Sequence, residues 1–141
     1  MKHLNKTFRD ISGKDWPKNE IPTDEDSNVV RKSYELYYKK IDEFTDEDLR
    51  FAIGQQWNLK YIIPLAIDIL RDNPFAEGDF YPGSLLENVL KSDRNYWKGH
   101  PNERKAIEEI FLKNLKSLDT LEVTDEIKYD IKNAFEEFFN I

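Results

Sequence analysis

The chain of 141 residues has a length typical of one domain and is long enough to bury a hydrophobic core without disulfides or metal. It contains no Cys, which excludes disulfide frameworks, thiolate metal sites and Cys nucleophiles. Its 28 acidic and 21 basic residues give a net charge of −7, which disfavours binding to nucleic acid or anionic lipid and favours a basic partner. Such a charge is also common simply because it keeps proteins soluble.

The first 26 residues are expected to form an extended arm, because their few apolar residues are scattered among charges and interrupted by Gly and Pro. Phe8 and Trp16 are the side chains that would pin this arm to the rest of the protein. A helix is predicted over about 28–41, where Val30 and three tyrosines recur at a spacing of three and four residues. This tyrosine stripe is expected to face the core.

The middle of the chain contains the most apolar run in the sequence. Thr45 is a good N-cap for a helix that should end near residues 55–58, and three acidic residues occupy its first turn. The segment 59–72 is predicted to be the central helix, because nearly all of its faces are apolar and need to be covered. Pro64 lacks a backbone N–H, so this helix should either begin near Ile62 or kink.

A loop rich in Gly, Pro and aromatic residues follows this helix. Asn73 and Pro74 should end the helix, and the three aromatic residues within 75–83 are too apolar to be left in water. We therefore expect the loop to fold back on the core. Glu77 and Asp79 resemble part of an acid–base or metal site, but no His lies near them in the sequence, so a structural role is favoured.

Three further helices are predicted after the loop. Apolar stripes indicate helices over 84–90, 101–118 and 124–139, the last of them capped by Thr124, Asp125 and Glu126. The polar turn between the first two, residues 91–99, carries Tyr and Trp, which are typical both of interfaces and of loops that fill a core. The sequence does not decide between these two roles.

These patterns predict an all-α fold, because no segment shows an alternation typical of a β-strand that we would trust. We expect a single compact domain over residues 1–141, with about six helices packed around the central apolar helix at 59–72. The first residues lack the apolar stretch of a signal peptide, and the apolar run 61–70 is about half the length needed to cross a bilayer. A cytoplasmic location is therefore expected.

The middle of the chain contains, in order, the blocks FTDEDLRFAIGQ, LKYIIPLAI and NPFAEGDFYPGSLL, which lie between Phe44 and Leu86. Together they resemble the immunity proteins of bacterial contact-dependent growth inhibition (CDI) systems. The resemblance does not extend to the first forty-odd residues or to the C-terminal third. It implies a small cytoplasmic protein that neutralises a toxin delivered by a neighbouring cell. It also implies that the toxin is the C-terminal domain of a large exoprotein encoded nearby, frequently a nuclease.

Sequence motifs for catalysis are missing. There is no phosphate-binding glycine loop, no nucleophile elbow, no zinc-protease motif and no EF-hand loop, and the chain has only two His. We therefore expect no enzyme activity, no catalytic residues, no cofactor and no metal.

The first functional hypothesis is a binding protein that covers the active site of its toxin or an adjacent exosite. Nuclease clefts are basic, so an acidic helical face would be complementary to one. Residues 119–141 contain seven acidic and two basic residues, a net charge of −5. The predicted toxin-binding residues are the acidic Asp46, Glu47, Asp119, Glu122, Asp125 and Glu126, with Tyr96 and Trp97 as aromatic anchors.

Two alternatives come from other classes of protein. The first is an acidic helical adaptor or regulatory protein that binds an unrelated host protein. The second is an enzyme that uses Glu77 and Asp79, in which Glu77→Gln would abolish an activity while leaving the fold intact.

Overall fold

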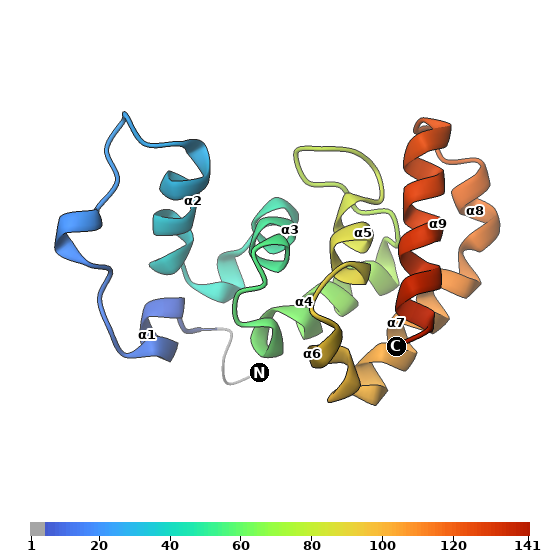
Figure 1. The fold of residues 1–141 in the computed structure, drawn as a ribbon, viewed down its shortest axis with the longest axis horizontal. Helices are drawn as coiled ribbons and strands as arrows, with labels where there is room; N and C mark the ends of the chain where they lie inside the picture. Colours follow the sequence, from blue (N-terminus) through green and yellow to red (C-terminus); the bar gives the residue numbers. More distant parts are fainter. Residues whose placement is uncertain (1–4) are drawn as a thin grey trace. The chain divides into compact units, whose positions relative to one another are not determined.

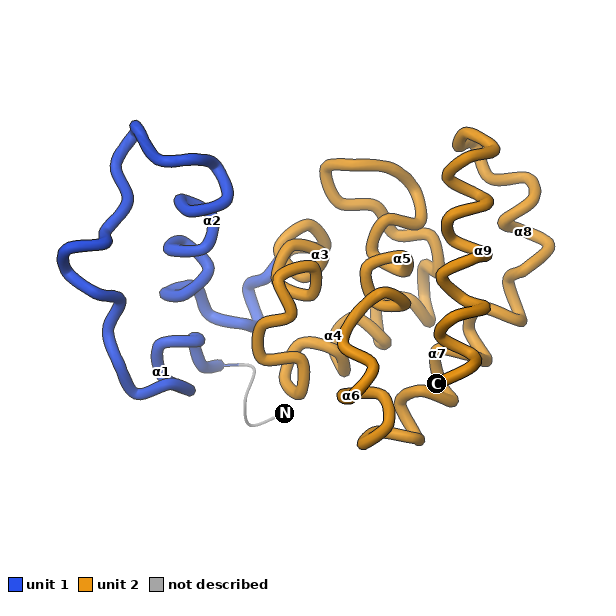
Figure 2. Tube along the Cα trace, viewed as in Figure 1, with its two compact units in different colours: residues 1–44 blue, residues 45–141 orange. Residues whose placement is uncertain are grey.

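The computed structural model describes residues 5–141, which form helices and connecting segments with no β-strand in that range. The chain divides into two compact units, Met1–Phe44 and Thr45–Ile141 (Figure 2). The predicted all-α fold class is confirmed. The described residues contain nine α-helices where about six were expected, because three five-residue helices occupy segments expected to be an arm, a turn or part of a longer helix. The single-domain organisation over 1–141 stays a prediction.

The first unit contains helix α1 (Phe8–Ser12) and helix α2 (Asn28–Tyr37), with 3₁₀ turns at Lys18–Glu20 and Ile41–Glu43. Helix α1 lies inside the segment that was expected to be an extended arm. Its start is stabilised by a capping box, in which the hydroxyl of Thr7 and the carboxylate of Asp10 each accept a backbone N–H from the other residue. This local signal outweighs the low apolar content of the segment.

Aromatic side chains hold the first unit together. The ring of Trp16 meets those of Tyr34 and Tyr37 edge-on, each at 5.5 Å between centroids, and the backbone N–H of Trp16 donates to the hydroxyl of Tyr38 at 2.9 Å. Phe8 is buried and packs edge-on against Phe44 at 5.6 Å. The prediction that Phe8 and Trp16 pin this segment is therefore confirmed.

The second unit contains the remaining helices (Figure 1). The predicted helix over 101–118 is divided at Asn114, whose side-chain amide donates to the carbonyl of Ile110 at 2.8 Å and so competes with the helical backbone. No helix in residues 5–141 combines the length and apolar character needed to span a membrane. The helices of this unit are α3 (Asp46–Gly54), α4 (Leu59–Asp72), α5 (Ser84–Leu90), α6 (Arg94–Lys98), α7 (Pro101–Lys113), α8 (Leu115–Asp119) and α9 (Asp125–Phe139).

Helix α4 is the centre of the second unit, since it packs against α3, α5 and α7. Both of its predicted ends are confirmed. It begins at Leu59 and continues through Pro64, which excludes the start near Ile62 that the sequence left open as the alternative to a kink. The buried apolar side chains recur every three or four residues and so share one broad face of the helix, instead of the nearly complete cover that the sequence predicted: Leu59, Ile62, Ile63, Ala66, Ile67 and Leu70.

Truncation of a side chain on α4 should destabilise the protein strongly. Leu70 is fully buried, so Leu70→Ala leaves a cavity and is expected to lower the free energy of unfolding by about 2–5 kcal/mol. The same substitution at Leu112, which is 54% exposed on α7, should change it by no more than about 0.5 kcal/mol. Urea unfolding of both variants provides the measurement, and equal effects would contradict the central position of α4.

Candidate partner-binding surface

The segment between α4 and α5, residues 73–83, is called here the α4–α5 loop. Figure 1 shows this loop leading from α4 into α5. A hydrogen bond joins it to the start of α3. One carboxylate oxygen of Glu47 accepts the backbone N–H of Asp79 at 2.9 Å. The same carboxylate receives two hydrogen bonds from the guanidinium of Arg50, at 2.6 and 2.5 Å. The two bonds to Glu47 raise the pKa of Arg50 above its usual value. The Glu47–Arg50 pair is called here the Glu47 clamp, because it holds the loop at the backbone of Asp79.

The same guanidinium supports an exposed aromatic ring. The central carbon of the Arg50 guanidinium lies 3.9 Å from the ring centroid of Phe80, a cation–π contact that is typically worth about 1 kcal/mol. The ring of Phe80 is nevertheless 63% exposed, while Ala76 in the same loop is buried. Glu77 and Asp79 are both exposed. The loop therefore displays one large apolar side chain beside two carboxylates.

Close packing fixes the first half of this loop. A Cβ added to Gly78 would lie 2.8 Å from the Cα of Glu47, closer than real Cβ atoms approach a backbone atom. Only Gly allows the loop backbone to lie this close to α3.

The second half of the loop is anchored on α5. The Tyr81 hydroxyl donates a hydrogen bond to the buried carboxylate of Glu87, which also pairs with Lys91 Nζ at 2.6 Å. Burial, together with this bond to Glu87, raises the pKa of the Tyr81 phenol well above its usual value. Gly83 closes the loop: it adopts a positive φ of 92° and donates its N–H to the carbonyl of Phe75 at 3.0 Å.

The four acidic residues predicted near the start of α9 are all exposed: Asp119, Glu122, Asp125 and Glu126. Of these, Asp119 is paired with Lys132 Nζ at 2.7 Å, and this hydrogen bond lowers the pKa of the Asp119 carboxyl. The N-cap predicted at Thr124 is confirmed, because its hydroxyl accepts the N–H of Ile127 at 3.2 Å. Asp125 and Glu126 then lie in the first turn of α9.

The structure brings the α4–α5 loop close to this acidic segment. A Cβ placed on Gly83 would lie 3.9 Å from Leu121 and 2.9 Å from Ile131, so the end of the loop lies beside Leu121 within the acidic segment and Ile131 just after it. Asp46 lies in the first turn of α3, next to the Glu47 clamp. Two elements that carry acidic residues, the start of α3 and the segment before and into α9, therefore border the loop.

Trp97 is the one predicted site residue that the structure excludes from the surface. Its side chain is fully buried, its indole N–H donates to the buried Ser92 hydroxyl at 2.8 Å, and its ring meets Phe138 of α9 edge-on at 4.9 Å. It fills the core and cannot serve as a surface anchor. Tyr96 is half-buried: its ring stacks on His100 at 3.9 Å and its hydroxyl donates to Glu103 at 2.6 Å.

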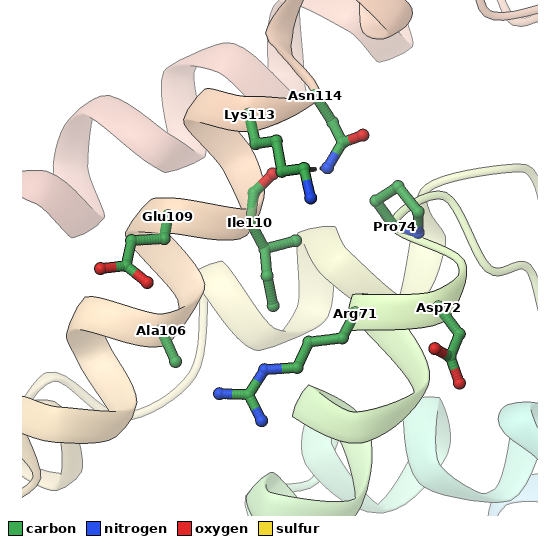
Figure 3. Close-up of a pocket in the computed structure, with 8 residues that line it drawn as sticks. All are labelled: Arg71, Asp72, Pro74, Ala106, Glu109, Ile110, Lys113 and Asn114. Carbon is green, nitrogen blue, oxygen red and sulfur yellow. Dashed lines mark hydrogen bonds between the residues drawn. The ribbon is translucent and has the colours of Figure 1, made fainter.

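A pocket of about 420 Å³ lies away from the predicted residues, between the last turns of α4 and α7 (Figure 3). Two basic and two acidic side chains contribute to its walls, so its charges are balanced. Its lining residues are Arg71, Asp72, Pro74, Ala106, Glu109, Ile110, Lys113 and Asn114. Within residues 5–141, no group of three or more His, Asp and Glu side chains is arranged to hold a metal ion.

The described residues are all-helical, and their candidate surface carries exposed carboxylates and one exposed aromatic ring. The family of CDI immunity proteins matches residues 10–107, more than two thirds of the chain, and the chain therefore belongs to this family. Membership implies binding to a cognate CDI toxin. The match is wider than the blocks between Phe44 and Leu86, since it begins in α1 and ends in α7. No curated protein and no solved structure matches the chain.

Sequence reasoning missed the roles of Phe80 and Arg50. The aromatic content of the loop was noted, but all three aromatic residues were expected to turn inward. A Gly directly before an acid–aromatic pair was the available signal that the backbone is held close to a neighbour.

Adding a methyl group to Gly78 should disturb the loop. Gly78→Ala is expected to lower the free energy of unfolding by about 1–3 kcal/mol, because the new Cβ collides with the backbone of α3. Gly99→Ala is the control, since its Cβ would lie an ordinary 3.6 Å from the carbonyl of Tyr96 and its φ is −86°. Urea unfolding measures both, and an equal response would show that the loop is not tightly held.

The Tyr81 phenol should make stability depend on alkaline pH. Its pKa is raised in the folded protein, so its contribution is complete below the unfolded pKa of ~10 and is lost as the pH rises above that value. Tyr81→Phe should therefore make the fall in the urea midpoint between pH ~9 and ~11 less steep. Tyr129→Phe, at a residue 68% exposed, should leave the slope unchanged. If Tyr81→Phe showed the same slope as the wild type, the raised pKa of Tyr81 in the folded protein would be contradicted.

Proposed function

We propose that the protein neutralises a nuclease toxin domain by binding its basic surface, over the active site or at an adjacent exosite. The observation that carries this proposal is the family match over residues 10–107. The toxin is proposed to be a nuclease because CDI toxins are frequently nucleases and because this protein is acidic. A net charge of −7 suits a partner whose substrate is a polyanion.

The proposed contact surface is the cluster of exposed carboxylates around the α4–α5 loop. Rim carboxylates steer a basic partner and raise the association rate, and salt weakens this effect. The half-buried Asp46 of α3 is proposed to belong to this surface, whereas Glu47 acts through the loop that it holds. Tyr96, also half-buried, is proposed as a separate contact on α6. The acidic members of the surface near α9 are Asp119, Glu122, Asp125 and Glu126.

The proposal describes a binding protein, not an enzyme, that requires no cofactor and contacts neither nucleic acid nor membrane directly. It acts in the cytoplasm, where a delivered toxin would meet its substrate. An acidic adaptor that binds an unrelated host protein is the competing function.

Calorimetric titration with the toxin domain encoded immediately upstream tests the proposal. We expect tight binding at low salt, weaker binding at high salt, and loss of toxin activity in the complex. Absence of binding at both salt concentrations would contradict the immunity function and leave the adaptor.

Charge reversal tests the surface. Asp125→Lys with Glu126→Lys changes the net charge from −7 to −3 and should weaken binding about tenfold at low salt. The control, Glu136→Lys with Glu137→Lys, makes the same change at two exposed residues at the other end of α9. If both double variants weaken binding equally, only net charge matters and the start of α9 is not a contact.

A further inference from the structure

We infer that Phe80 is the apolar anchor of this interface and inserts into an apolar pocket with a basic rim on the toxin domain. The inference rests on the proposed function and adds to it the residue and the chemistry of the partner's site.

The exposure of Phe80 is the first observation. A Phe ring left in water forgoes the stabilisation that burial gives. Phe80 is 63% exposed although Ala76, four residues earlier in the loop, is 1% exposed. The loop is therefore folded onto the protein while this ring is directed outward. Aromatic rings presented in this way are typical of the residues that dominate binding energy at interfaces.

The second observation is that the ring is held in place before any partner binds. Arg50 lies 3.9 Å from its centroid and is itself fixed by two hydrogen bonds to Glu47, which also binds the N–H of Asp79. Gly78 brings the loop backbone against α3. A side chain that is already ordered loses little conformational entropy on binding, so more of its contact energy appears as affinity.

The third observation is charge. The loop, residues 73–83, contains Glu77 and Asp79 but no Lys or Arg, and both carboxylates are exposed. The guanidinium beneath the ring is neutralised by Glu47. The partner that fits is an apolar pocket bordered by Lys or Arg side chains, which would bury the ring and pair with the two carboxylates at the rim.

Binding kinetics of Phe80→Ala with the toxin domain encoded upstream test the inference. We expect affinity about 30-fold weaker, mainly through faster dissociation, with the salt dependence of binding unchanged because no charge is removed. Phe139→Ala is the matched control, since Phe139 is 54% exposed at the last residue of α9 and should bind like the wild type.

The outcomes separate the two proposals. If the wild type does not bind the toxin domain at any salt concentration, the proposed function and the inference both fail. If the wild type binds and Phe80→Ala binds equally well, the inference alone is overturned. An equal loss in Phe139→Ala would also overturn it, because the effect would then be general to exposed aromatic residues.

Fluorescence of Phe80→Trp gives a readout that does not depend on lost affinity. The difference spectrum between this variant and the wild type isolates the added indole. Its emission should shift to shorter wavelength when the toxin domain binds, because the indole leaves water. Binding without such a shift would show that residue 80 stays in solvent and would overturn the inference.

Discussion

The pairing of Glu47 with Arg50 determines the shape of the candidate surface. Both side chains are largely shielded from water, at 13% and 12% exposure, so removal of either charge would leave the other poorly compensated. The pair also makes the two contacts that define the loop, one to the Asp79 backbone and one to the Phe80 ring. A short ion pair on one helix therefore orders a segment thirty residues away in the chain.

The helical core makes this arrangement possible. Helix α4 is covered by α3, α5 and α7, and α5 in turn packs against α9. Both α3 and α9 carry acids in their first turn. Acids are favourable there because they face the positive end of the helix dipole. At the start of α9 these carboxylates, Asp125 and Glu126, are exposed, whereas at the start of α3 Asp48 is buried and Glu47 is largely shielded by its pairing with Arg50.

Two aromatic residues show how this immunity protein divides its large apolar side chains between core and surface. The sequence left Trp97 open as either an aromatic anchor or a residue that fills the core, whereas Phe80 was expected to fold inward. The buried hydroxyl of Ser92 satisfies the Trp97 indole and Phe138 covers its ring, so it belongs to the core. Phe80 has a cation behind it and stays largely in solvent, which is the arrangement that a binding anchor requires.

The sequence by itself determined the all-helical fold, both ends of α4 and the caps at Thr45 and Thr124, because these depend on periodicity and on neighbours within one turn. The family was also readable from three blocks of residues. The tertiary structure alone decided that Trp97 is buried, that Phe80 is exposed and that Glu47 holds a loop. Each of these depends on a partner outside the local segment, such as Phe138 for Trp97 or Asp79 for Glu47, and local spacing carries no information about such contacts.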